Sequence, residues 1–95
     1  MVEDAGQFTR VVTIVNTKGL HARASAKFVQ TTAKFDASVA VTKDSNSVSG
    51  TSIMGLMMLG AGIGSQLSIS AQGGQAREVL DALQALVESK FGEDT

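Results

Sequence analysis

The stretch Phe8-Thr9-Arg10-Val11-Val12-Thr13-Ile14-Val15-Asn16-Thr17-Lys18-Gly19-Leu20-His21-Ala22-Arg23 decides how the fold of this chain begins. Residues 8–15 are rich in Val, Ile and Thr, a composition that favours a β-strand. Residues 16–19 predict a turn, because Asn and Gly tolerate backbone conformations that strands and helices avoid. A helix is expected over residues 22–33, where small and apolar side chains recur at helical spacing and predict one apolar face: Ala22, Ala26, Val29 and Ala33.

The rest of the chain adds three strands and two helices. Alternating apolar and polar residues predict strands at 37–42 and 66–71, and the polar residues 43–47 predict a hairpin turn before a short strand at 48–50. A short helix is expected at 52–59, capped by Thr51 or Ser52 and ended by the glycines that follow. The clearest helix is followed by Gly92 in the usual stop position, and its apolar positions are Ala76, Val79, Leu80, Leu83, Val87 and Phe91.

The predicted order of elements is therefore β-α-β-β-α-β-α. Sequential strands mostly pair, and a helix with one apolar face must cover a sheet. We expect an α+β fold, an open-faced β-sandwich in which a four-stranded antiparallel sheet has three helices on one face. The chain has 95 residues, enough for a single domain spanning 1–95, with residues 1–7 as a loose N-terminal tail.

Composition excludes several kinds of site. The chain has no Cys and one His, so neither a thiolate nor a multi-His metal site is expected, and we predict no metal and no cofactor. A net charge of -1 and only four aromatic residues argue against nucleic-acid binding. The longest apolar stretch, residues 53–63, is interrupted by glycines and falls short of the ~20 residues that a membrane helix needs. No targeting signal is evident at the start, so we expect a cytoplasmic monomer without membrane insertion.

His21 stands where the first turn meets the first predicted helix. A helix start presents unpaired N–H groups and a partial positive charge, which favour a phosphate or another anion. An imidazole there can act as a nucleophile, and Arg23 can pair with phosphate oxygens. The same residues also fit a surface histidine beside a solvated arginine, so the pattern by itself leaves both interpretations open.

The second helix offers two further candidates. Ser52 is in the position of a helix cap, and a phosphate added there would be favoured by the helix dipole. The apolar residues after it cannot all face inward from one short helix; we expect Leu56 and Leu59 in the core, and a contact patch at Ile53, Met54 and Met57. Gly60, Gly62 and Gly64 lack the spacing and the Lys of a nucleotide-binding loop and predict a connector.

Two motifs together resemble a known family. Gly19-Leu20-His21-Ala22-Arg23, followed by Ser52-Ile53-Met54-Gly55, resembles the HPr family, the histidine-containing phosphocarriers of the bacterial phosphoenolpyruvate-dependent phosphotransferase system. The form Gly-Leu-His-Ala-Arg-Ala-Ser-Ala looks like the proteobacterial branch, including its nitrogen-related version. The resemblance runs from about Phe8 to Phe91 and agrees with the predicted order of elements.

The resemblance implies a role for each motif residue. His21 would accept a phosphoryl group on Nδ1 from enzyme I and pass it to an EIIA-type protein, and Arg23 would help to hold it. Ser52 would be phosphorylated by an HPr kinase/phosphorylase. Partners would bind a shared surface that includes Ala22, Ala26, Ile53, Met54 and Met57.

One departure and two alternatives accompany this reading. Family members usually have Pro after the motif Arg, where this chain has Ala24; we expect a looser helix start with one more N–H donor and no loss of transfer. One alternative is a ferredoxin-like ligand-binding domain with a similar order of elements. The other is an interaction module that is regulated through Ser52 and has lost carrier activity. The sequence fits either sugar uptake or nitrogen regulation.

Overall fold

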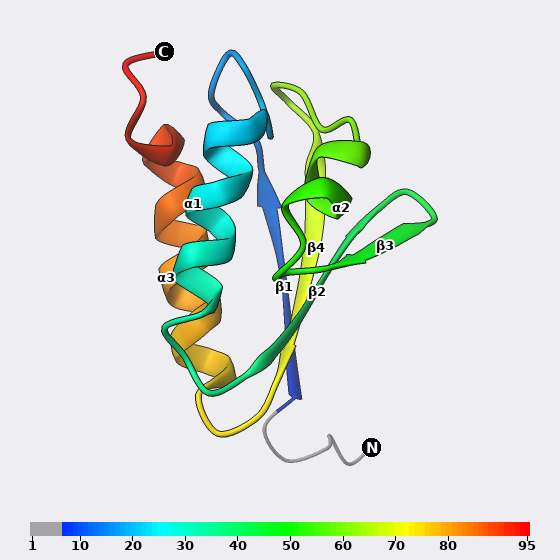
Figure 1. Ribbon diagram of the computed structural model, residues 1–95, viewed down its shortest axis with the longest axis vertical. Coiled ribbons are helices and arrows are strands. Elements are labelled where there is room, and N and C mark those ends of the chain that lie inside the picture. The colour runs from blue at the N-terminus through cyan, green and yellow to red at the C-terminus, as the bar shows by residue number, and fades with distance from the viewer. Residues whose placement is uncertain (1–6) are drawn as a thin grey trace.

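Four strands form one antiparallel sheet in the computed structural model of this chain, which describes residues 7–95. The strands β1 (Gln7–Thr13), β2 (Ser38–Lys43), β3 (Asn46–Ser49) and β4 (Gln66–Gln72) lie in the order β1-β4-β2-β3. Three helices, α1 (Ala22–Thr32), α2 (Ile53–Met58) and α3 (Ala76–Glu88), lie on one face (Figure 1). The predicted open-faced α+β fold is confirmed. Residues 1–6 of the expected N-terminal tail lie outside the described residues, and Gln7 belongs to β1.

The core lies between the helices and the sheet. Alternation in β1, β2 and β4 buries one side of each strand, as predicted. α3 packs on β1 and β4, and α1 packs on α2 and α3. The largest side chains with under 2% exposure are Phe28, Phe91, Ile14, Leu56, Leu67, Ile69, Leu80 and Leu83.

α1 buries a different face from the one we predicted. Ala22 and Ala33 are exposed, and Ala26 and Val29 are half-buried. The helix turns inward its largest side chain, Phe28, together with Ala24, Ser25 and Thr32. The two polar members of this face are compatible with the core because their hydroxyls donate to backbone carbonyls of Leu20 and Phe28. The small residues thus lie on the outer side of the helix, where a partner can reach them.

The end of α3 also differs from the prediction. The helix ends at Glu88, and a short 3₁₀ turn, η1 (Lys90–Gly92), follows. Lys90 and Phe91 both have left-handed backbone angles, with φ of 60° and 55°. This turn puts Phe91 into the core although it is not part of the helix, and it redirects residues 93–95 toward the start of α1.

The predicted hairpin is present with a shorter turn. Lys43 pairs with Asn46 and Thr42 with Ser47, so only Asp44 and Ser45 connect β2 to β3. Asp44 has a φ of 55°, the left-handed conformation that a two-residue hairpin turn needs. Within residues 7–95, no helix has the length and apolar character needed to cross a membrane.

Candidate functional site

The turn before α1 is held by one buried side chain. Asn16 is fully buried, and its Nδ2 donates to the carbonyl of Gly19 at 2.9 Å. Gly19 has a φ of 65°, and a Cβ at this position would lie 2.3 Å from the carbonyl oxygen of Ala61. Leu20 donates its amide to that same carbonyl at 2.9 Å. Only glycine therefore lets this turn pack against the connector after α2, which explains the Gly of the histidine motif.

His21 is the N-cap residue of α1, at the place where the sequence predicts an anion site. Its backbone is extended, and its carbonyl accepts the first helical hydrogen bond, from the amide of Ser25 at 2.9 Å. Its side chain makes no cap hydrogen bond, so among residues 7–95 the amides of Ala22, Arg23 and Ala24 have no backbone partner. The imidazole is 26% exposed and can be reached from solvent.

Glu93 contacts the imidazole directly, and the motifs in the sequence gave no indication of this residue. Its Oε2 pairs with Nε2 of His21, and its Oε1 accepts from Nδ2 of Asn16 at 3.0 Å. The hydrogen bond with His21, then that with Asn16 and the charge of Lys18, hold the pKa of the Glu93 carboxyl below its ordinary value, although partial burial opposes this. The carboxylate is therefore the stable form at neutral pH.

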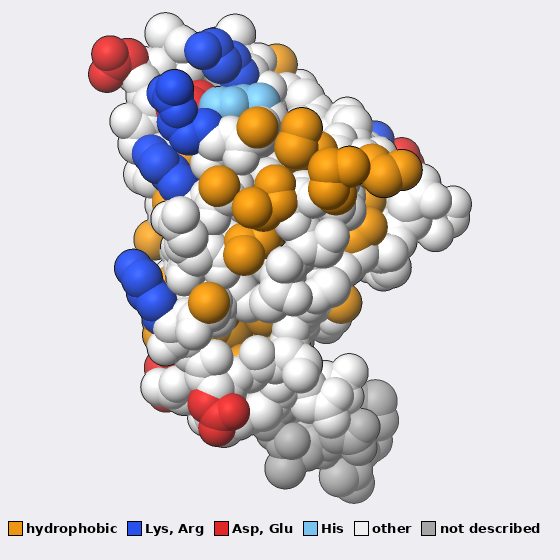
Figure 2. All heavy atoms as spheres, viewed as in Figure 1, with side chains coloured by type: hydrophobic (Ala, Val, Ile, Leu, Met, Phe, Trp, Pro, Cys, Tyr) orange, Lys and Arg blue, Asp and Glu red, His pale blue; other side chains and the backbone are white. Residues whose placement is uncertain are grey.

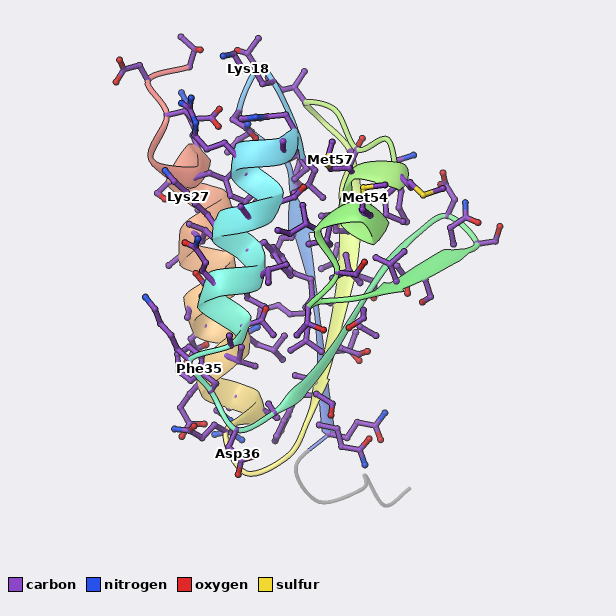
Figure 3. All side chains as sticks on the ribbon, viewed as in Figure 1. Lys18, Lys27, Phe35, Asp36, Met54 and Met57 are labelled. Atoms are coloured by element: carbon purple, nitrogen blue, oxygen red, sulfur yellow. The ribbon has the colours of Figure 1, made fainter. Side chains whose placement is uncertain are left out.

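Three basic side chains lie around Glu93, the residue that contacts the imidazole. Lys18, Arg23 and Lys27 line a hollow of about 310 Å³ together with residues 92–95. Nζ of Lys27 donates to the carbonyl of Phe91 at 2.6 Å, which fastens η1 to α1. Figure 2 shows the histidine between these basic side chains and an apolar surface, and Figure 3 places Lys18 and Lys27 at this end of the molecule. The predicted pair of His21 and Arg23 thus gains two lysines that the sequence pattern did not single out.

Ser52 is the N-cap residue of α2, a position for which the sequence predicts either Thr51 or Ser52. Its Oγ accepts from the amide of Gly55 at 2.9 Å, and a Cβ on Gly55 would lie 2.9 Å from that oxygen. The cap therefore accounts for both the Ser and the Gly of this motif. The side chain of Ser52 is half-buried at the edge of the apolar surface.

The exposed apolar surface of α2 is larger than predicted. Leu56 and Leu59 are buried, as expected, and Ile53, Met54 and Met57 are 40%, 68% and 40% exposed. Met58, which we did not predict, is 80% exposed. We call the four exposed residues of α2 the methionine patch. Since α2 packs against α1, the methionine patch and the outer face of α1 form one side of the molecule (Figures 2 and 3).

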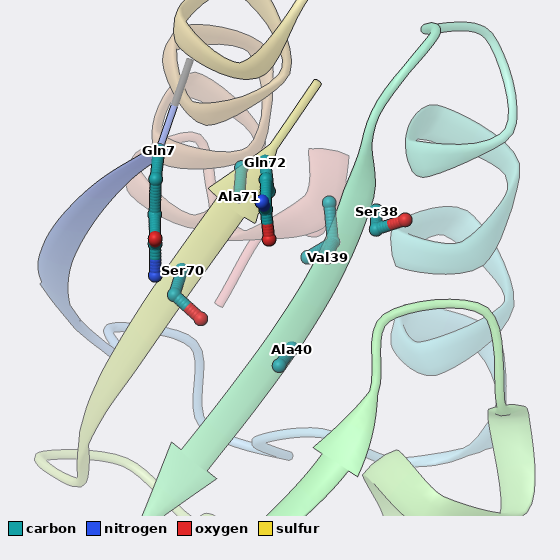
Figure 4. A pocket seen from close by; sticks show the side chains of 7 residues that line it. All are labelled: Gln7, Ser38, Val39, Ala40, Ser70, Ala71 and Gln72. Atoms are coloured by element: carbon teal, nitrogen blue, oxygen red, sulfur yellow. The ribbon is translucent and has the colours of Figure 1, made fainter. Parts of the chain in front are cut away.

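A second hollow lies on the sheet and offers no chemistry. It has a volume of about 160 Å³ and is lined by side chains of β1, β2 and β4, all of them Gln, Ser, Val or Ala (Figure 4). None of these side chains titrates near neutral pH or is a nucleophile without an activating base. Among residues 7–95, no cluster of three or more His, Asp or Glu side chains could hold a metal ion.

Comparison with known proteins gives a consistent result. Residues 8–89 match a family model described as "PTS HPr component phosphorylation site". The chain is 46% identical over 84 residues to the phosphocarrier protein HPr of Cupriavidus necator, with 88% of this chain and 94% of that protein covered. It is 40% identical over 84 residues to the phosphocarrier protein NPr of Shewanella violacea, with 88% and 92% covered. The crystal structure of HPr-C-His from Thermoanaerobacter tengcongensis superposes with a TM-score of 0.88 at 44% identity, covering 93% and 99%.

Proposed function

Because this chain belongs to the HPr family of phosphocarriers of the phosphotransferase system, we propose that His21 accepts a phosphoryl group from enzyme I and passes it to EIIA-type proteins. One observation carries the proposal. The partly exposed imidazole lies at the first turn of α1, where three amides lack a backbone partner among the described residues, and three basic side chains line the hollow beside it with Glu93. These groups favour the negative charge of a phosphoryl group and need no cofactor to do so.

Arg23 has a supporting role in this proposal. Its side chain lines the basic hollow, and among residues 7–95 it has no acidic partner. A guanidinium can give two parallel hydrogen bonds to phosphate oxygens, which suits it to hold the transferred group. Ala24 supplies an N–H at the third position of the helix, where the usual Pro would have none.

The methionine patch, together with Ala22 and Ala26 of α1, is the proposed docking surface. A surface of exposed Met, Ile and small Ala side chains adapts to differently shaped partners, which a carrier that meets several proteins requires. The basic side chains beside it favour partners with an acidic rim. The proposed surface comprises Ala22 and Ala26 on α1 and Ile53, Met54 and Met57 on α2, to which Met58 is added.

The test is incubation with phosphoenolpyruvate and enzyme I. The wild-type chain should take up one phosphate that is labile in acid and stable in base, whereas His21→Ala should take up none. A wild-type chain that stays unmodified would overturn the proposal and leave a ligand-binding domain as the better reading. Offering sugar-type and nitrogen-type EIIA proteins separately then assigns the branch. Cytoplasmic location and a monomeric state stay predictions from the sequence.

Ser52 is the basis of a second proposed role, regulation by an HPr kinase/phosphorylase. A phosphate adds about -1.5 to -2 charges at neutral pH. That is large against a net charge of -1, and it would lie at the edge of the methionine patch. A module that is read only through Ser52 predicts that Ser52→Ala abolishes regulation of a partner while His21→Ala leaves it intact. Loss of regulation in His21→Ala as well would contradict that alternative.

A further inference from the structure

Two hydrogen bonds connect the imidazole of His21 to a buried amide. Asn16 donates through Nδ2 to Oε1 of Glu93, and the other carboxyl oxygen pairs with Nε2 of His21. The same Nδ2 also donates to the carbonyl of Gly19. Since a carbonyl and a carboxylate can only accept, the amide must present its NH₂ group to both, and its orientation is fixed by the network. The side chain of Asn16, which is fully buried, therefore fixes the position of the Glu93 carboxylate.

The charge of Glu93 determines which ring nitrogen bears the proton. An ionised carboxylate has no proton to donate, so the imidazole must donate to it through Nε2. Its hydrogen bonds keep the pKa of this carboxyl low, which supports the ionised form. In a neutral ring with the proton on Nε2, the free lone pair is on Nδ1. Within residues 7–95, the hydrogen bond of the ring is made through Nε2, which leaves Nδ1 for the phosphoryl group.

We propose that Glu93, oriented by Asn16, is a positioning residue that fixes the proton of His21 on Nε2 and so makes Nδ1 the nucleophile for the phosphoryl group. The inference rests on the proposed function of His21 and deepens it. It gives a role to two residues that lie outside both sequence motifs and that come together only in the folded chain.

The transfer step balances without moving a proton. The lone pair of Nδ1 attacks phosphorus, the donor's bond to phosphorus breaks, and that electron pair leaves with the donor. The new Nδ1–P bond makes the ring cationic while Nε2 keeps its proton, and the carboxylate of Glu93 stabilises that charge. Transfer to the acceptor reverses the step: the Nδ1–P bond breaks, and its electron pair returns to Nδ1.

Substitution of Glu93 is a clean perturbation, because other contacts hold the same segment. The carbonyl of Thr95 accepts from the amide and the hydroxyl of Thr17, at 2.7 and 2.8 Å. Nζ of Lys27 holds the carbonyl of Phe91. The segment should therefore stay in place in Glu93→Gln and Glu93→Ala, and backbone amide NMR shifts of Thr17 and Thr95 close to those of the wild type would verify this.

The experiment combines nitrogen-15 NMR of the imidazole with initial rates of phosphoryl uptake from phosphoenolpyruvate and enzyme I. In the unphosphorylated wild type, the ring should be almost entirely protonated on Nε2. Glu93→Ala should show a mixture of both tautomers and accept phosphate about tenfold more slowly, the equivalent of one charge-assisted hydrogen bond. Glu93→Gln, whose amide oxygen still accepts, should fall between them. Glu88→Gln removes one charge from the exposed end of α3 and should match the wild type.

The possible outcomes separate this inference from the proposed function. If the wild type takes up no phosphate at His21, the proposed function fails, and the positioning role fails with it. If the wild type is phosphorylated but Glu93→Ala keeps the same tautomer and the same rate, only the positioning role is overturned. A changed tautomer with an unchanged rate also overturns it, because the proton would then have no bearing on transfer.

Discussion

Replacing Ser52 by Asp or by Ala separates the two functions of this side chain, the helix cap and the proposed regulatory charge. In the wild type, Oγ accepts from the amide of Gly55 at 2.9 Å. Ala removes this acceptor, which costs about 1 kcal/mol for a typical cap. For a domain of this size, 1 kcal/mol lowers Tm by about 4–8 °C. Asp keeps an acceptor and adds a negative charge at the helix start, a favourable term of about 0.3–1 kcal/mol.

Ser52→Asp should therefore be more stable than Ser52→Ala but slower in phosphoryl transfer. Ser52→Asp should melt at or above the wild-type Tm, yet it should accept phosphate from enzyme I more slowly, because its charge repels an acidic partner and lies at the edge of the methionine patch. Ser52→Ala should melt lower and transfer normally. The slowing in the Asp variant should shrink as salt is added, since screening weakens exposed charges.

Calorimetry measures the Tm of each variant, and initial-rate assays on the same preparations measure phosphoryl uptake from enzyme I. If Ser52→Asp melts as low as Ser52→Ala, the account of the α2 cap is wrong. If Ser52→Ala slows transfer as much as Ser52→Asp does, the added charge is not the cause of the slowing.

Three more changes test the packing and the electrostatics around the site. Gly19→Ala should lower the free energy of unfolding by at least about 2 kcal/mol in a urea titration, because its Cβ would meet the carbonyl of Ala61 at a left-handed φ. Phe28→Ala should cost about 3–5 kcal/mol in the same assay, whereas Val29→Ala should cost about 1 kcal/mol or less; equal costs would contradict the buried face described for α1. The carboxyl of Glu93 has a pKa below its ordinary value of 4.5, so its stabilising contribution is present above pH 4.5 and is lost as the pH falls through the folded pKa. The difference in urea midpoint between the wild type and Glu93→Gln should shrink accordingly in acid, and a difference that grows would refute this sign.

The sequence predicts most of the fold because its signals are local. Strands with period-two burial, a capped helix and a hairpin each depend on neighbouring residues, although the turn of the hairpin is shorter than predicted. Spacing was a poor guide for α1, where four small residues gave a helical pattern on the outer side and one large side chain, Phe28, determined the buried face. Burial area outweighs the number of apolar positions, since a phenyl ring removes far more surface from water than a methyl group.

The site was predictable only in part. The motif around His21 identified the imidazole and the helix start, because both are set by adjacent residues. Glu93 lies 72 positions further along the chain and reaches His21 through the left-handed backbone of Lys90 and Phe91, which no local pattern indicates. Lys18 and Lys27 gather around the same point only after the turn and α1 have formed. Asn16 was predictable as a turn residue. Its burial and its hydrogen bond to Glu93 depend on the tertiary fold.

The central claim is that His21 carries a phosphoryl group reversibly between proteins. Phosphorus-31 NMR of the isotope-labelled chain tests it directly, with phosphoenolpyruvate and enzyme I present first and an EIIA-type acceptor added afterwards. We expect a single phosphorus–nitrogen resonance coupled to Nδ1 of His21, which disappears as the acceptor takes the group. A resonance that is absent, that survives in His21→Ala, or that persists after the acceptor is added would contradict it.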